Sequence, residues 1–131
     1  MQAYSIMTRT KIAASPRATA QELAFYMTLA GFSGIPIAVE DGTIVGIVSE
    51  QDIIRLLNRG VALESVTAEE VMTTEVRTVG FDTPLADILQ VFDKHHFLLL
   101  PVVHEGKISG IVSRADALRA ATHGHFMAWV A

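Results

Sequence analysis

Gly46-Ile47-Val48-Ser49-Glu50-Gln51-Asp52 returns later in the chain as Gly110-Ile111-Val112-Ser113-Arg114-Ala115-Asp116. A proline-containing apolar stretch precedes each copy, at residues 34–39 and 99–103, and the dipeptide Met-Thr occurs further upstream of each, at 7–8 and 72–73. The two copies are offset by 65 residues at Pro36 and Pro101 but by 64 at Gly46 and Gly110, so one intervening turn is a residue longer in the first copy. An internal repeat of this length predicts a fold of two similar halves.

Hydrophobic spacing predicts the order strand-helix-strand-strand-helix in each half. The expected helices are 19–30, 51–57, 83–92 and 115–121, with a short helix near 67–71 inside the connection 58–70. The expected strands are 11–14, 35–39, 44–48, 76–79, 97–103 and 108–112. Pro84 is expected in the first turn of its helix, where a missing N–H costs little. The strands are nearly all apolar, so both faces of each sheet are expected to be covered.

The chain of 131 residues has room for one compact unit, and each half alone would be a marginal size for independent folding. We therefore expect the repeats, 1–60 and 61–131, to form one module with an α+β fold. Half of the residues are hydrophobic and 18% are charged, which suggests that a partner, most simply a second copy of the chain, covers some apolar surface. The apolar tail 123–131 is expected to pack on another surface.

Charge and composition exclude several classes of protein. The net charge of −4 and the pI of about 5.6 argue against nucleic-acid binding, which normally needs a clustered basic face. Cysteine is absent, so disulfides and thiolate chemistry are excluded. No apolar stretch reaches the roughly 18 residues of a membrane helix, and the N-terminus does not resemble a signal peptide. The expected location is the cytoplasm.

The two Gly-Ile-Val-Ser-x-x-Asp stretches, the Pro-apolar strands, the acidic-Gly turns and the Met-Thr openings together resemble the tandem cystathionine-β-synthase-type (CBS) domain pair, or Bateman module. The resemblance covers residues 4–121. It implies two repeats packed sheet to sheet around a pseudo-twofold axis. The clefts between such repeats bind adenosine-containing ligands: AMP, ADP or ATP, or else S-adenosylmethionine or NAD(H). Such modules sense the ligand and regulate an attached enzyme, channel or transporter; here we expect a stand-alone member that signals to another chain.

The Ser-x-x-Asp spacing has a simpler interpretation as a helix N-cap. A serine at the cap accepts a backbone N–H, and an acidic residue three positions on reaches back, which is a capping box. Thr67 and Glu70 show the same spacing in the connection, where no ligand is expected. The spacing alone therefore favours capping as the sole role of Ser49, Asp52, Ser113 and Asp116.

A ligand-binding role is compatible with the cap. The positive end of a helix suits a phosphate, a serine hydroxyl there adds a donor, and a carboxylate one turn later accepts the two hydroxyls of a ribose. By resemblance, Asp52 and Asp116 take the ribose, while Ser49 and Ser113 lie on the phosphate side. Arg114 pairs well with phosphate, whereas Glu50 would repel it, so the second motif is expected to dominate.

The resemblance to the CBS family also implies which residues hold the base of the nucleotide. These are four residues of the first strands and two beside the strand prolines Pro36 and Pro101, namely Ile12, Ala13, Val76, Thr78, Ile35 and Leu100. Many members of the family carry Arg or Lys just before the proline strand. This chain has Ser33-Gly34 and Leu98-Leu99 there, which favours the single phosphate of AMP over a triphosphate.

Two other functional classes find less support. His95 and His96 are adjacent and diverge on a helix, where they are expected to mark its C-terminal end, and His123-Gly124-His125 lacks a further ligand at metal-site spacing. No Gly-x-Ser-x-Gly elbow and no glycine-rich phosphate loop occur, so we expect no enzyme. The sequence thus predicts a dimeric regulatory module that binds an adenine nucleotide. The alternatives are a purely structural interaction module and a histidine-based metal sensor.

Overall fold

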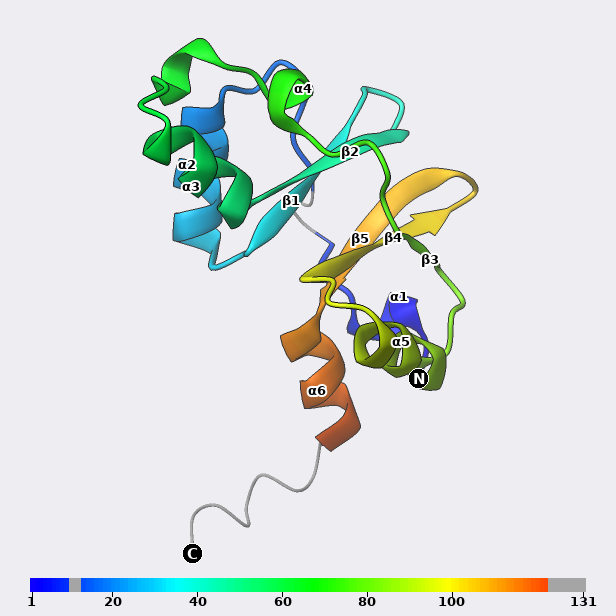
Figure 1. Cartoon of the computed structure of the whole chain (residues 1–131). Helices are drawn as coiled ribbons and strands as arrows, with labels where there is room; N and C mark the ends of the chain where they lie inside the picture. Colours follow the sequence, from blue (N-terminus) through cyan, green and yellow to red (C-terminus); the bar gives the residue numbers. More distant parts are fainter. Residues whose placement is uncertain (10–12, 123–131) are drawn as a thin grey trace, which may run out of the picture.

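The computed structural model describes residues 1–9 and 13–122 and places the strands of both halves in the middle of the molecule (Figure 1). After α1 (Ala3–Ile6), the first half contains α2 (Ala20–Ala30), β1 (Gly34–Ala38), β2 (Ile44–Ser49) and α3 (Glu50–Asn58). A 3₁₀ turn (Leu63–Ser65) and α4 (Ala68–Val71) connect to the second half. That half contains β3 (Val79–Gly80), α5 (Leu85–Lys94), β4 (Leu99–His104), β5 (Lys107–Ser113) and α6 (Arg114–Thr122).

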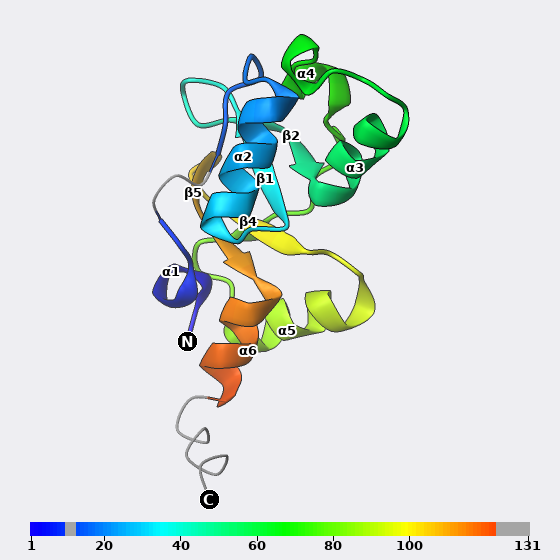
Figure 2. The same cartoon turned by 90° about the vertical axis from the view of Figure 1, so that its left-hand side faces the viewer.

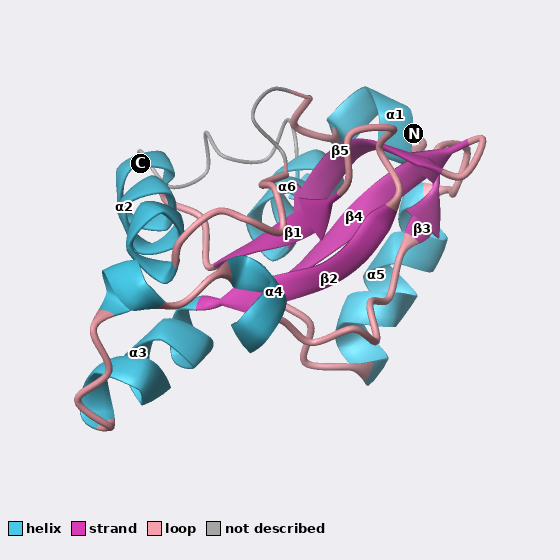
Figure 3. Cartoon of the chain, turned by 90° about the horizontal axis from the view of Figure 1, so that it is seen from above, coloured by secondary structure: helices cyan, strands magenta, loops and turns pink. Residues whose placement is uncertain are grey.

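The helices form two groups on opposite sides of the strands. α2, α3 and α4 lie above the strands in Figure 1, and α1, α5 and α6 lie below them. The view from above accordingly has α4 in front of the strands and α6 behind them (Figure 3). This arrangement confirms the predicted α+β fold of two similar halves. Pro84 lies one residue before the first helical position of α5 and acts as its N-cap residue, not in its first turn as the sequence suggested.

The hairpins β1–β2 and β4–β5 repeat each other in register. Pro36 pairs with Ile47 in the first, and Pro101 pairs with Ile111 in the second. Both ladders shift by one residue at the same place, between Ile37 and Ala38 and between Val102 and Val103. The connection between β1 and β2 is longer than the tight Glu105-Gly106 turn, where both residues have positive φ. The predicted length difference therefore lies in the hairpin turn.

The first strand of each half is shorter than the sequence suggested. In the second half only Val79 and Gly80 pair with β4, so the predicted strand 76–79 was wrong for residues 76–78. In the first half the equivalent position is Ala14, which forms a single parallel bridge to Ile37. Because residues 75–77 leave the sheet, they are available to line a pocket; residues 10–12 lie outside the described part of the chain.

Each half completes its core with a segment that precedes the other half. Ala3 and Met7 belong to the buried cluster that contains Ile88, Leu100 and Val112, whereas Ala68 belongs to the cluster around Leu23, Ile37 and Val48. α1 packs against β5 and α6 (Figure 2), and α2 lies on the opposite side of the strands (Figure 1). The backbone also pairs the segment before one half with a strand of the other half, because Thr8 bridges Ile111 and Thr73 bridges Ile47. The boundary between the repeats at residue 60 remains a prediction. Each buried cluster contains residues from both sides of this boundary.

Candidate functional site

Both Ser-x-x-Asp motifs form capping boxes, as the spacing predicted. The Ser49 N–H donates to Asp52 Oδ2 at 2.8 Å, and the Asp52 N–H donates to Ser49 Oγ at 3.2 Å. In the second motif the equivalent distances are 2.9 Å and 3.0 Å, between Ser113 and Asp116. The motifs therefore fix the N-termini of α3 and α6 at the ends of β2 and β5.

The second oxygen of each aspartate holds an arginine of the same helix. Arg55 Nη1 lies 3.3 Å from Asp52 Oδ1, and Arg119 Nη1 lies 3.2 Å from Asp116 Oδ1. The aspartate side chains are only 18% and 17% exposed, whereas the arginines are 50% and 74% exposed. An exposed ion pair of this kind contributes little stability, so each arginine can leave its carboxylate when a ligand arrives. A carboxylate with a replaceable partner is suited to accept ribose hydroxyls.

Asp116 lies in a cleft that both halves build. This pocket of about 390 Å³, called here the Asp116 cleft, contains Ser113, Arg114, Asp116 and Arg119 of the second half. Its other wall is the turn Gly31–Ser33 of the first half, with Leu98 and Leu99 between them. The N-terminal residues of α6 therefore share a pocket with an aromatic residue of the opposite repeat, Phe32, whose ring also lies 6.2 Å from that of Tyr26.

Asp52 lies in a second cleft that mirrors the first. This pocket of about 260 Å³, the Asp52 cleft, joins Ser49 and Asp52 of the first half to segments 75–77 and 96–99 of the second. The segment 96–98 is 65 residues after 31–33, so Phe97 occupies the place that Phe32 has in the Asp116 cleft. The two clefts are thus related by the pseudo-symmetry of the repeats.

The paired phenylalanines were missed in the sequence. Phe97 packs against the core of the second half, and nothing in the local sequence indicates that it or Phe32 also lines a cleft. Both side chains are half-buried, and both occur four residues before the strand proline. That shared position is the signal that could have identified them, since a half-buried aromatic ring is the side chain best able to stack on a base.

The predicted base-holding residues do not all reach the clefts. Val76 lines the Asp52 cleft, but Thr78 lines a separate pocket between β3 and α5. Ala13 lines a pocket near the hairpin turns, and Ile12 lies outside the described residues.

The residues at the strand prolines are buried. Ile35 and Leu100 are 3% and 0% exposed and belong to the two cores, and Pro36 and Pro101 are fully buried. None of the four lines a cleft. Gly34 and Leu99, one residue earlier on each strand, line the clefts because neighbouring strand residues point to opposite faces. Contact of Ile35, Pro36, Leu100 and Pro101 with a ligand stays a prediction that their burial does not favour.

The charges of the clefts differ from the sequence-based expectation. Arg114 lines the Asp116 cleft as predicted. Glu50 is exposed and is not among the residues of the Asp52 cleft, which instead receives Glu75, Arg77 and His96 from the second half. The Asp52 cleft therefore has its own cations, and the comparison of Glu50 with Arg114 does not by itself rank the two clefts.

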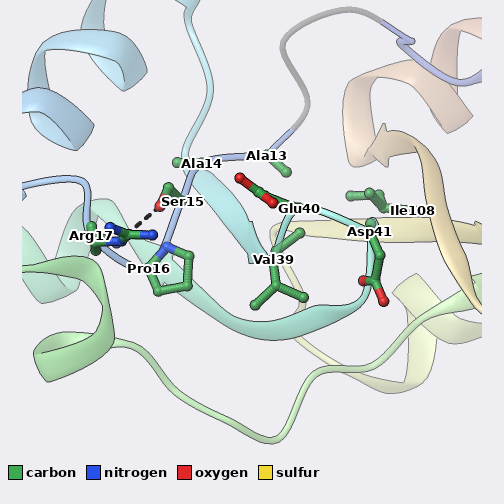
Figure 4. Close-up of a pocket in the computed structure, with 11 residues that line it drawn as sticks. Ala13, Ala14, Ser15, Pro16, Arg17, Val39, Glu40, Asp41 and Ile108 are labelled. Atoms are coloured by element: carbon green, nitrogen blue, oxygen red, sulfur yellow. Dashed lines mark hydrogen bonds between the residues drawn. The ribbon is translucent and has the colours of Figure 1, made fainter.

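A pocket larger than either cleft lies elsewhere. It measures about 650 Å³ and is lined by segments 13–17 and 38–42 with Ile108 (Figure 4). The Ser15 hydroxyl at its rim is already bound to the backbone N–H of Arg17. We place the candidate site in the two smaller clefts because only they combine a helix N-terminus, a half-buried carboxylate and an aromatic ring from the other repeat.

Two observations concern metals and membranes. Within residues 1–9 and 13–122, no three His, Asp or Glu side chains lie together as a metal site would need. His95 caps the C-terminus of α5, and His123 and His125 lie outside the described residues. In the same part of the chain, no helix has the length and apolar character that crossing a membrane requires.

The chain belongs to the CBS domain family, whose model matches residues 3–59 and 68–123. It is therefore a tandem CBS pair. It is 31% identical to the uncharacterized protein MK0525 of Methanopyrus kandleri, over 85% of this chain and 58% of that protein. It is 32% identical to the inosine-5'-monophosphate dehydrogenase of Halobacterium salinarum, over 86% of this chain and 22% of the enzyme. The chain thus spans less than two thirds of the length of these curated relatives.

Solved structures of CBS pairs superpose on most of the chain. The CBSX2 protein in complex with AMP has a TM-score of 0.80 and 25% identity, covering 92% of this chain and 95% of that one. The CBS pair of protein MJ0100, in complex with 5-methylthioadenosine and S-adenosyl-L-methionine, has a TM-score of 0.80, 27% identity and the same coverage. Hypoxic Response Protein I, with two coordinated zinc ions, has a TM-score of 0.80 and 27% identity, covering 91% of this chain and 98% of that one.

Proposed function

We propose that this CBS pair is a regulatory module that binds an adenosine-containing nucleotide between its repeats and signals to a partner chain. One observation carries the proposal: each Ser-x-x-Asp helix start shares a pocket with residues of the opposite repeat. A ligand in such a pocket contacts both halves, so it can stabilise one arrangement of the repeats over another.

The Asp116 cleft is the better adenine nucleotide site. Its volume of about 390 Å³ lies within the range of small-molecule pockets, whereas the Asp52 cleft, at about 260 Å³, is smaller. In this cleft Asp116 would accept the ribose hydroxyls once Arg119 moves aside. The N-terminus of α6, the Ser113 hydroxyl and the Arg114 guanidinium would hold the phosphate, and Phe32 would stack on the base.

The ligands of related proteins support this assignment. AMP in CBSX2, and S-adenosyl-L-methionine and 5-methylthioadenosine in MJ0100, share the adenosine group. A single phosphate matches the Asp116 cleft better than three, because two arginines and one helix N-terminus supply its positive charge. We therefore propose AMP as the preferred adenine ligand.

The regulatory step is a population shift. A ligand changes the balance of two arrangements only to the extent that it binds them with different affinity. Since the two walls of the Asp116 cleft belong to different repeats, the nucleotide favours the arrangement in which these walls are close. The partner chain would then bind one arrangement of the repeats in preference to the other.

A homodimer is the proposed assembly. Phe25 and Leu29 on α2, and Ile54 and Leu57 on α3, are large apolar side chains that are at least 54% exposed. The two helices pack against each other, so these side chains can form one surface. Burial of this surface in a second copy would remove it from water. Leu29→Glu should then convert the dimer to a monomer in sedimentation velocity without unfolding it.

A thermal-shift panel tests the proposed ligand. AMP at 100 times its dissociation constant should add about 2.7 kcal/mol to the unfolding free energy, a shift of several degrees in Tm. ADP, ATP, S-adenosylmethionine and NADH complete the panel. Asp116→Ala should weaken AMP binding more than Asp52→Ala does, and mass spectrometry of the purified protein should reveal any nucleotide carried through.

The alternatives predict different outcomes of the same panel. An unchanged Tm with every nucleotide would contradict the proposal and favour a purely structural interaction module. Stabilisation by zinc alone, abolished when His123 and His125 are replaced by alanine, would indicate a metal sensor instead. Equal losses in the two aspartate variants would contradict the ranking of the clefts.

A further inference from the structure

The two clefts differ at positions that the repeat makes equivalent. Glu75 and Arg77 line the Asp52 cleft. The offset of 65 residues relates them to Thr10 and Ile12, which are neutral. The Asp52 cleft therefore has a charged pair at positions that are neutral in the sequence of the first repeat. Nothing in the capping role of α3 requires this pair, since α6 has the same cap without it.

Neither charge is neutralised within the described part of the chain. The ion pairs there involve Asp52, Asp41 and Asp116, and none includes Glu75 or Arg77. Both side chains are exposed and flank Val76, which lines the same cleft. Glu75 and Arg77 therefore offer a carboxylate acceptor and a fork of guanidinium donors to a ligand in the Asp52 cleft, although Arg77 also borders the pocket between β3 and α5.

A 6-oxopurine matches this combination better than adenine. Guanine and hypoxanthine offer adjacent acceptors, O6 and N7, to an arginine fork. They also carry an N1–H that a carboxylate accepts, and guanine adds the N2 amino group. Adenine has a lone pair at N1, which would face the carboxylate unfavourably, and an amino group in place of O6.

We propose that the Asp52 cleft selects a guanine-type nucleoside monophosphate, with Glu75 and Arg77 reading the edge of the base. This inference rests on the proposed function, because it assumes that Asp52 accepts the ribose as Asp116 does. Phe97 would stack on the base, and Ser49 with the N-terminus of α3 would receive the phosphate. The chain would thus compare two purine nucleotides, one in each cleft.

Calorimetric titration of the full chain tests the base preference. In Asp116→Ala, which leaves only the Asp52 cleft intact, GMP should bind at least tenfold more tightly than AMP. IMP should fall between them, because it lacks the N2 amino group. In the otherwise unchanged chain, Glu75→Gln and Arg77→Met should each weaken GMP binding about tenfold while AMP binding stays the same. Glu64→Gln and Arg59→Met, which lie outside both clefts, are the matched controls.

Native mass spectrometry adds a measurement that needs no substitution. A mixture of GMP and AMP should give a chain that carries one molecule of each. Tighter binding of AMP than of GMP by Asp116→Ala, or unchanged GMP binding in both charge variants, would overturn the inference and leave the adenine site standing. If the unchanged chain binds neither nucleotide, the proposed function itself fails, and this inference fails with it.

Discussion

Lys107 Nζ lies 3.0 Å from Asp41 Oδ2, in an ion pair that joins the hairpin turn of the second repeat to that of the first. The backbone strengthens the contact, because the Ile108 N–H donates to the Gly42 carbonyl at 2.9 Å. These turns lie at the starts of β2 and β5, whereas Ser49 and Ser113 lie at the ends of the same strands. The repeats are therefore tied at one end of the hairpins and separated by the clefts at the other.

The pH dependence of stability should report on this contact. Hydrogen bonds from the Thr43 side chain and backbone, and then from Lys107, lower the pKa of Asp41 from 3.8 to about 2. A carboxyl with a depressed pKa stabilises the fold above its ordinary pKa, and the contribution disappears as pH falls from about 4 to about 2. Asp41→Asn should therefore melt below the unsubstituted chain at pH 7, and the two Tm values should converge toward pH 2.

Two controls separate this effect from general acid unfolding. Glu40→Gln removes a neighbouring carboxylate that has no hydrogen bond or ion pair among the described contacts. It should not reproduce the convergence. Because Asp41 is exposed, the effect should be small and should weaken further in 1 M salt. A constant difference in Tm across the whole pH range would contradict the assignment.

Gly46 and Gly110 are equivalent in the repeat, but their replacement by alanine should cost different amounts of stability. A Cβ at Gly110 would lie 2.7 Å from the Thr8 carbonyl oxygen and 2.6 Å from Met7 Sδ. At Gly46 the three nearest atoms all belong to the flexible Met72 side chain. Gly110→Ala must displace a backbone that is hydrogen-bonded to Ile111, so it should cost about 1–3 kcal/mol. Gly46→Ala should cost less.

Urea denaturation measures both variants. A lower midpoint at an unchanged slope indicates lost stability rather than a changed unfolded state. If Gly46→Ala proves as costly as Gly110→Ala, the Met72 side chain has less freedom than its flexibility suggests. The contacts also explain the repeated Met-Thr dipeptide: each copy packs on the glycine of the opposite repeat.

The repeat predicted the fold because duplicated hydrophobic patterns specify local structure directly. The helices 20–30 and 50–58 and both hairpins follow from spacing, turn residues and caps. The exchange of Ala3–Ile6 and Ala68–Val71 between the cores could not be predicted. A four-residue helix carries too short a pattern to indicate which apolar surface it covers.

The candidate site was predicted in part for the same reason. Asp52 and Asp116 are specified by a local motif, whereas Phe32, Phe97 and Arg77 enter the clefts only through the packing of one repeat on the other. Ligand contact by Ile35 and Leu100 stays a prediction; both lie in the cores, and family position does not say which strand face points to the cleft. Gly34 and Leu99, one residue earlier, occupy that face.

The role of Ser113 as a helix cap should be separable from its role in binding AMP. Thr19 caps α2 with the same geometry that Ser113 uses for α6, and it lies in neither cleft. Ser113→Ala and Thr19→Ala should each lose about 0.5–2 kcal/mol of stability without ligand. Only Ser113→Ala should also lose part of the Tm shift with AMP. Equal AMP shifts in the two variants would mean that Ser113 acts as a cap alone.

The paired phenylalanines should affect different ligands. Phe32 lines the Asp116 cleft and Phe97 lines the Asp52 cleft, so each phenylalanine shares a cleft with a helix start of the other repeat. Loss of a stacking ring costs about 1–3 kcal/mol of binding per base. Phe32→Ala should therefore weaken AMP binding by this amount in a calorimetric titration, whereas Phe97→Ala should leave it unchanged.

Phe81→Leu is the matched control for the loss of an aromatic ring. Phe81 stacks on Tyr4 at 4.9 Å between ring centroids and lines neither cleft. It should lower Tm without changing the affinity for AMP. If Phe97→Ala weakens AMP binding as much as Phe32→Ala does, the nucleotide occupies both clefts, and the division of ligands between them is wrong. If neither variant changes the affinity, the base does not stack on these rings, and the apolar wall formed by Leu98 and Leu99 must hold it instead.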